Sequence, residues 1–188
     1  MGRPLRIQEP NHFFHVMNRG NNKQPLFFHE KDYLEYLRLI RRFKEKFSIK
    51  LYHYVLMPNH VHFLLEPTLP NTLSRFMQSL TLSHTKIFNL KHSQSGHVWQ
   101  GRYKSNLIED DTYLLQCGRY IELNPVRARL ALHPAQYRWS SYLVHALGMK
   151  NKLVDENPLY TNFGSSPAIR MTEYQKFIEQ NPGFEWRV

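Results

Sequence analysis

Two histidines separated by a single residue are the side chains of this chain best suited to chemistry. His60 and His62 lie in the run from Leu56 to Glu66, whose apolar residues are typical of a buried strand. Alternate residues of a strand point to the same face, so the two imidazoles share one face and Val61 takes the other. Neutral imidazole binds several divalent metals, and a same-face pair supplies half of a metal site. The alternative is an ordinary strand whose polar face carries two of the chain's eleven histidines.

A tyrosine near a helix end is the second candidate. Residues 111–123 have the apolar spacing of a helix, and Pro125 predicts that this helix ends at Asn124, because proline disfavours helical geometry in the residue before it. Tyr120 and Asn124 are four residues apart and are therefore neighbours on one helix face. A phenol beside an amide that can bind a cation is a candidate nucleophile for a metal-held phosphate. The alternative is a core tyrosine whose hydroxyl reaches water.

Four motifs together resemble the single-tyrosine HUH transposases, and most closely the REP-associated tyrosine transposases. Each motif is weak alone, but the set is specific because it occurs in the family's order, between about residues 11 and 142. The motifs are His15-Val16-Met17-Asn18-Arg19-Gly20-Asn21-Asn22, Met57-Pro58-Asn59-His60-Val61-His62, Trp99-Gln100-Gly101-Arg102-Tyr103-Lys104 and Tyr120-Ile121-Glu122-Leu123-Asn124-Pro125-Val126-Arg127-Ala128.

The resemblance implies a domain that binds folded single-stranded DNA, cuts it and holds the 5′ phosphate covalently on tyrosine. It matches Tyr120 to the nucleophile and His60 and His62 to the metal-binding pair, with Mg²⁺ or Mn²⁺ as the expected ion. Asn124 matches a position where related enzymes place a third polar ligand, often Gln. Glu66, on the same strand parity as the histidines, is a further candidate ligand or base, with a solvated strand-end carboxylate as its alternative.

Several basic and polar residues are candidates for contacts with DNA. Asn18 and Arg19 end the first expected strand, and their family counterparts lie near the DNA. Cations hold phosphates and aromatic faces stack unpaired bases, so the segment Arg102-Tyr103-Lys104 suits both contacts, with a plain surface strand as the alternative. The remaining candidates are Arg127 and Arg129, which follow the tyrosine, and Arg3 and Arg6 near the N-terminus.

Composition favours nucleic acid as the partner. The net charge is +10: residues 1–150, with 21 Lys/Arg and 10 Asp/Glu, carry +11, and residues 151–188 carry −1. No apolar run approaches the roughly 20 residues that a membrane span needs, so no membrane partner is expected. Cys117 is the only cysteine, which fits a reducing compartment and excludes a cysteine-rich zinc site. The expected location is the cytoplasm, in association with the nucleoid, and monomer and homodimer remain open alternatives.

The order of elements predicts an α+β fold with helices packed on an antiparallel sheet, and the resemblance implies a ferredoxin-like version of it. Strands are expected over 12–18, 49–56, 60–66 and 98–108, the last as one or two strands, and helices over 30–47, 72–89, 111–123 and 172–180. After about Tyr142 the chain is rich in Gly, Pro, Asn and Ser, which interrupt helices and strands. This favours a transposase domain over residues 1–145 and an appendage of unknown role over residues 146–188.

Three functions follow from these residues. The first is an endonuclease and strand transferase that acts on hairpin-forming repeats through a 5′-phosphotyrosine. The second is a binder or regulator of folded single strands without catalysis. The third is a metal-dependent phosphoesterase in which the histidines activate water and Tyr120 is only a core residue.

Overall fold

A four-stranded antiparallel sheet forms the centre of the structure. The computed structural model describes residues 10–180, and its strands lie in the order β2-β3-β1-β4. Two helices connect the strands in the sequence βαββαβ, which is the ferredoxin-like arrangement, so the predicted fold class is confirmed. The bounds are β1 (Phe13–Arg19), α1 (Glu30–Lys46), β2 (Ile49–Met57), β3 (His60–Pro67), α2 (Thr72–His92) and β4 (Lys104–Ile108).

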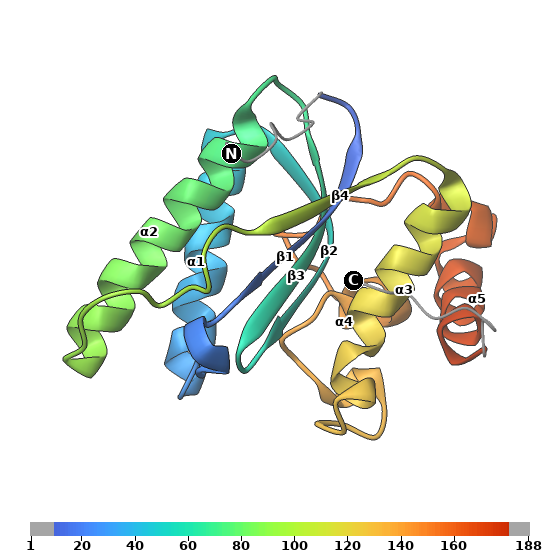
Figure 1. Ribbon diagram of the computed structural model, residues 1–188. Helices are drawn as coiled ribbons and strands as arrows, with labels where there is room; N and C mark the ends of the chain where they lie inside the picture. Colours follow the sequence, from blue (N-terminus) through green and yellow to red (C-terminus); the bar gives the residue numbers. More distant parts are fainter. Residues whose placement is uncertain (1–9, 181–188) are drawn as a thin grey trace.

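The alternation of side chains along the strands separates two faces of the sheet. Phe14 and Val16 of β1 and Phe63 of β3 are buried in the main core together with residues of α1 and α2. His15 and His62 point to the opposite face, over which α3 (Asp111–Arg127) packs against β2 and β3. Figure 1 shows the resulting layers, with α1 and α2 on one side of the sheet and α3 with the C-terminal helices on the other.

The end of β1 is held by two neighbouring loops. The Gly20 N–H donates to Asn59 O at 2.8 Å, and the Gln100 N–H donates to Arg19 O at 2.8 Å. A side chain on Gly20 would collide with the backbone oxygen of Gln24, so this position requires glycine. These bonds fix Arg19 beside the turn between β2 and β3, where His60 begins its strand.

The helix that carries Tyr120 is longer than the sequence indicated. The predicted end at Asn124 is wrong, because α3 continues through Pro125 to Arg127. Proline costs a helix most in its interior; here it lies in the last turn, where it removes one N–H. The Ala128 N–H still donates to Asn124 O at 2.9 Å, and the Leu130 N–H donates to Pro125 O at 2.8 Å. Asn124 therefore keeps helical geometry and stays on the same face as Tyr120.

The C-terminal part of the described chain packs on the core. Asp155 Oδ2 accepts from the Leu51 N–H at 2.7 Å and lies 2.6 Å from Lys44 Nζ.

Two C-terminal helices differ from the prediction. Helix α4 (Tyr142–Leu147) was not predicted, because it is too short for a periodic pattern, and α5 (Pro167–Glu179) begins earlier than predicted. Ser166-Pro167 is a helix start rather than a break, since Ser166 Oγ accepts from the Ile169 N–H. Short 3-10 turns span Asn21–Lys23, Pro134–Gln136 and Tyr160–Phe163. Among residues 10–180, no helix has both the length and the apolar character needed to cross a membrane.

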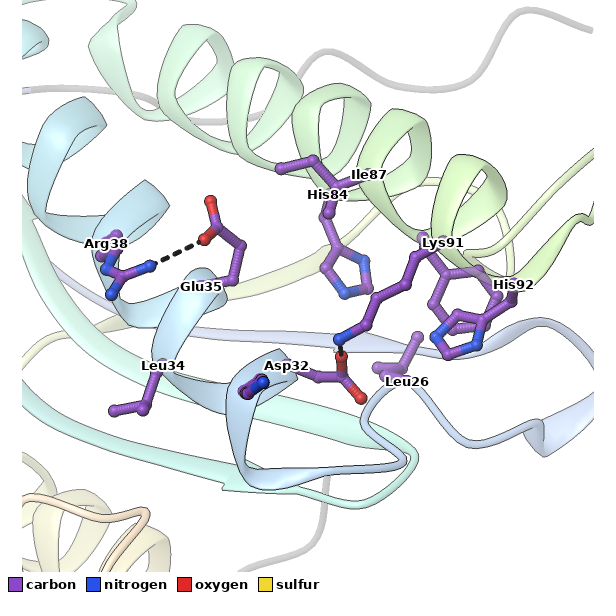
Figure 2. A pocket seen from close by; sticks show the side chains of 11 residues that line it. Leu26, Asp32, Leu34, Glu35, Arg38, His84, Ile87, Lys91 and His92 are labelled. Atoms are coloured by element: carbon purple, nitrogen blue, oxygen red, sulfur yellow. Dashed lines mark hydrogen bonds and ion pairs between the residues drawn. The ribbon is translucent and has the colours of Figure 1, made fainter.

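A cavity of about 490 Å³ lies between α1 and α2, on the side of the sheet away from α3. In Figure 2, Asp32 of α1 bonds Lys91 of α2, and the ring of His84 points between the two helices. His84 is 5% exposed, and burial lowers its pKa from 6.5 to about 4, against the opposing effects of a backbone hydrogen bond to Leu26 and of the Asp32 charge. The neutral ring is therefore the form that the folded protein accommodates.

This lowered pKa predicts a loss of stability in acid. Below pH 6.5 the unfolded chain takes up the His84 proton while the folded chain does not, so the unfolding free energy falls as the pH drops from 6.5 toward 4. A pKa difference of this size corresponds to roughly 3 kcal/mol at pH 4. We expect His84→Gln to reduce the acid-induced loss by about that amount. Urea unfolding at pH 7, 5.5 and 4.5 measures the effect, with His97→Gln, a change at an exposed histidine, as the control. Parallel pH curves for wild type and His84→Gln would contradict it.

Candidate active site

The two predicted metal-binding histidines lie on the α3 face of the sheet. The rings of His60 and His62 are 5.1 Å apart between centroids, and register pairs His60 with Arg19 and His62 with Met17. His62 Nδ1 lies 2.9 Å from Nε2 of His15, and His60 Nδ1 lies 2.7 Å from Oδ1 of Asn59. When each Nδ1 carries the proton, the Nε2 atoms of His60 and His62 keep their lone pairs for a metal.

The surroundings keep these histidines neutral. Burial lowers the pKa of His60 to about 4, with a further effect of the Arg19 charge, while a hydrogen bond with Asn124 acts in the opposite direction. The pKa of His62 is also strongly lowered, by burial first and then by His15, His60 and Arg19. Neutral imidazole is the form that coordinates metal ions, so the donor set fits a divalent cation.

Helix α3 brings the predicted nucleophile to the same place. The Tyr120 ring makes edge contacts with His62, at 5.6 Å between centroids, and with His15, at 5.8 Å. One turn further along α3, Asn124 bonds His60 and donates from Nδ2 to Tyr120 O at 3.1 Å. The guanidinium of Arg127 lies 5.2 Å from the centre of the Tyr120 ring. A phenol, two neutral imidazoles, an amide and two arginines thus meet at one end of the sheet.

Residues 9–124 match the family model "Transposase IS200 like". The chain belongs to the IS200-like transposase family. The match includes Tyr120, both histidines of the pair and Asn124, and it confirms the wider family that the four motifs indicated. No match was found among curated proteins.

Two solved structures are similar to this IS200-like transposase, and the first of them shares its fold. One is the "REP associates tyrosine transposase bound to a REP hairpin", with a TM-score of 0.67 and 18% identity over 82% of this chain and 94% of that chain. Another is a crystal structure from Deinococcus radiodurans R1, also described as a transposase, with a TM-score of 0.44 and 17% identity over 65% of this chain and 95% of that chain.

The other predicted DNA contacts of this IS200-like transposase lie in three places. Lys104, in register with Met17, stands on the same sheet face as His62, two strands and so roughly 10 Å away. Asn18, Arg102 and Tyr103 line a cavity of about 330 Å³ on the α2 side of the sheet. Arg129 is exposed just beyond α3. Arg3 and Arg6 lie outside the described residues.

Tyr103 is buried, whereas stacking on a base requires an exposed ring face. Its side chain is 7% exposed and belongs to the main core, and its hydroxyl lies 3.0 Å from Ser74 Oγ. In this structure the ring face is therefore covered. Glu66 lies at the far end of β3 from His60, where it bonds Tyr52 and Lys50 instead of joining the histidine pair.

A second polar cluster lies beneath α3. His53 of β2, Glu122 of α3 and His145 of α4 are buried, and their ligand atoms all lie within 4.8 Å of one another, so this group could hold a metal ion. It is separate from the predicted pair His60 and His62.

No role was predicted from the sequence for His15, His53, Glu122 or His145. His15 lies in a motif that carried the family resemblance, and a histidine in the middle of an apolar strand was the available signal. The other three are contributed by separate elements far apart in the sequence, so their meeting depends on the tertiary structure.

Proposed function

We propose that this protein is a single-strand DNA endonuclease and strand transferase of the REP-associated type, with Tyr120 as its nucleophile. The observation that carries the proposal is the edge contact of the Tyr120 ring with His62, next to the Asn124–His60 contact. Tyr120 packs against the apolar cluster beneath α3, yet its ring also faces His62 and His15, beside the predicted metal site. This arrangement favours covalent catalysis over a phosphoesterase that activates water.

The chain's own residues account for the reaction. Tyr120 Oη attacks phosphorus and the bond to the 3′ oxygen breaks; the phenol gives up its proton, the leaving oxygen takes up one, and the products are a 5′-phosphotyrosine and a free 3′-hydroxyl. When bound at His60, His62 and Asn124, Mg²⁺ or Mn²⁺ supplies charge that polarises the phosphoryl oxygens. Arg19 and Arg127 stand where they can hold the phosphates on either side. The phosphotyrosine conserves the energy of the phosphodiester, so a 3′-hydroxyl can attack it and rejoin strands.

We propose that the partner is a DNA hairpin with unpaired flanks, since the structurally similar transposase is bound to a REP hairpin. Asn18 Nδ2 is buried, lines the 330 Å³ cavity and has no hydrogen-bond partner within residues 10–180. A neighbouring cavity of about 420 Å³ shares Thr81 and Gly101 with it and extends to Trp99. Two adjoining pockets, lined by both apolar and polar side chains and with Arg102 in the wall of one, suit successive unpaired nucleotides.

Binding should depend on DNA structure and on salt. We expect a hairpin with single-stranded flanks to bind at least tenfold more tightly than a duplex of the same length, because only unpaired bases can enter the pockets. The +11 charge of residues 1–150 predicts a steep fall in affinity between 50 and 200 mM salt. Fluorescence anisotropy with labelled oligonucleotides measures both. Equal affinity for hairpin and duplex, or affinity independent of salt, would count against the proposal.

Strand cleavage itself is tested by incubating an end-labelled hairpin with protein and Mn²⁺ and then denaturing the mixture. A covalent adduct supports the proposal, cleavage without an adduct supports the phosphoesterase, and binding without cleavage supports the regulator.

A further inference from the structure

The carboxylate of Glu122 is fully buried and accepts four hydrogen bonds. Its Oε1 accepts from His53 Nδ1 at 2.9 Å, from His145 Nδ1 at 3.0 Å and from Ser141 Oγ at 2.6 Å. Its Oε2 accepts from Tyr174 Oη at 2.7 Å. Burial alone would raise the pKa of Glu122, but His145 and His53 lower it, so the carboxylate is ionised. A buried carboxylate with four donors is stabilised without a bound cation.

Three of these four donors come from segments outside the region that matches the family. The match ends at residue 124, whereas Ser141, His145 and Tyr174 lie beyond it, next to or within α4 and α5. A fourth residue of the same region, Asn157, is buried and bonds His53, with Nδ2 lying 3.0 Å from His53 Nε2. The C-terminal segment therefore supplies most of the polar contacts around Glu122.

The cluster contacts α3, the helix that carries Tyr120, at two positions. A Cβ on Gly118 would lie 2.8 Å from His53 Nε2, so the imidazole packs directly on the α3 backbone at that position. Glu122 follows Gly118 by four residues on the same helix face and is bonded by the same histidine. Two contacts one turn apart resist both rotation and sliding of α3 over β2.

Rotation of α3 would displace the phenol of Tyr120. A side-chain atom about 6 Å from the helix axis moves by about 2 Å when the helix turns through about 20°. Misplacement of a reacting group by about 1 Å can lower a rate by about a hundredfold. The rotational setting of α3 therefore matters for chemistry more than for DNA affinity, which is spread over many contacts.

We propose that Glu122 and its donors His53, Ser141, His145 and Tyr174 form a positioning cluster, through which the C-terminal segment sets α3 so that Tyr120 faces His62. The proposal rests on the proposed function for its kinetic consequence alone. It assigns Ser141, His145 and Tyr174 a role in the rate of strand cleavage and none in DNA affinity.

The test removes single donors from the full-length chain. Tyr174→Phe and Ser141→Ala each delete one hydroxyl bonded to Glu122. Tyr160→Phe is the matched control, because Tyr160 contacts the same apolar cluster but donates to the backbone oxygen of His145, at 2.5 Å. At saturating hairpin, and at a temperature where all variants are folded, we expect both donor variants to form the adduct at least tenfold more slowly, with dissociation constants within about threefold of wild type. Tyr160→Phe should keep the wild-type rate.

A second readout does not require activity. With 3-fluorotyrosine incorporated only at position 120, the ¹⁹F resonance should shift or split in Tyr174→Phe and Ser141→Ala and stay unchanged in Tyr160→Phe. If wild type forms no adduct, the proposed function fails, and the resonance still decides the positioning claim. An unchanged resonance in both donor variants, or equal changes in the control, would overturn the positioning cluster. So would a stoichiometric metal in the purified protein that is lost in His145→Gln.

Discussion

Tyr120→Phe should abolish the covalent adduct and leave hairpin binding intact. The substitution removes only the hydroxyl, so the edge contacts of the ring with His62 and His15 can persist. Without the nucleophilic oxygen no phosphotyrosine can form, and we expect cleavage to fall by at least about a thousandfold. Thermal unfolding should stay close to wild type, because the ring continues to pack. The measurement is a quenched time course of strand cleavage with an end-labelled hairpin.

The control for this result is Tyr113→Phe. Tyr113 lies on the same helix and is 46% exposed, about two turns before Tyr120. The Tyr113→Phe variant should cleave the hairpin at the wild-type rate. An adduct that persists in Tyr120→Phe and disappears in Tyr113→Phe would transfer the nucleophile to the other tyrosine.

His60→Ala and His62→Ala should each remove metal-dependent cleavage while leaving the hairpin bound. Two neutral imidazoles supply most of the predicted coordination, and losing either one should lower cleavage by at least about a hundredfold. DNA affinity should stay within about threefold, because it comes from many cationic and polar contacts. Of the two, His62→Ala should also cost stability, since it leaves a cavity beside His15.

Calorimetric titration with Mn²⁺ in the absence of DNA measures the metal affinity of these variants. His145→Gln is the necessary comparison, because the buried group around Glu122 is a second place where a metal could bind. Metal affinity that is unchanged in both His60→Ala and His62→Ala but lost in His145→Gln would refute the ligand assignment.

The parts of this account that depend on local pattern could be predicted from the sequence. Alternation placed His60 and His62 on one strand face, helical spacing placed Asn124 beside Tyr120, and the order of elements gave the α+β fold. Pro125 misled the prediction of the helix end, since a proline in the last turn removes only one hydrogen bond and the surrounding contacts outweigh its local preference.

Contacts between distant segments could not be predicted in this way. His15 bonds His62 across 47 positions, and Tyr174 bonds Glu122 across 52, because strand pairing and helix docking bring them together. The covered ring of Tyr103 has the same origin: its position next to two cationic residues suggested a surface, but the packing of α2 against the sheet buries it. Local sequence carries no signal for such packing.

The most direct test of the central claim is to identify the tyrosine that carries DNA in the wild-type protein. After reaction with a hairpin, the adduct is trimmed with nuclease and digested with trypsin, which separates Tyr120–Arg127 from Ser105–Arg119, the peptide that contains Tyr113. Tyr103 falls in a third peptide, Tyr103–Lys104. We predict that the nucleotide mass is found on Tyr120–Arg127, with fragment ions that place it on the tyrosine. The same mass on a peptide containing Tyr103 or Tyr113, and none on Tyr120, would contradict the account.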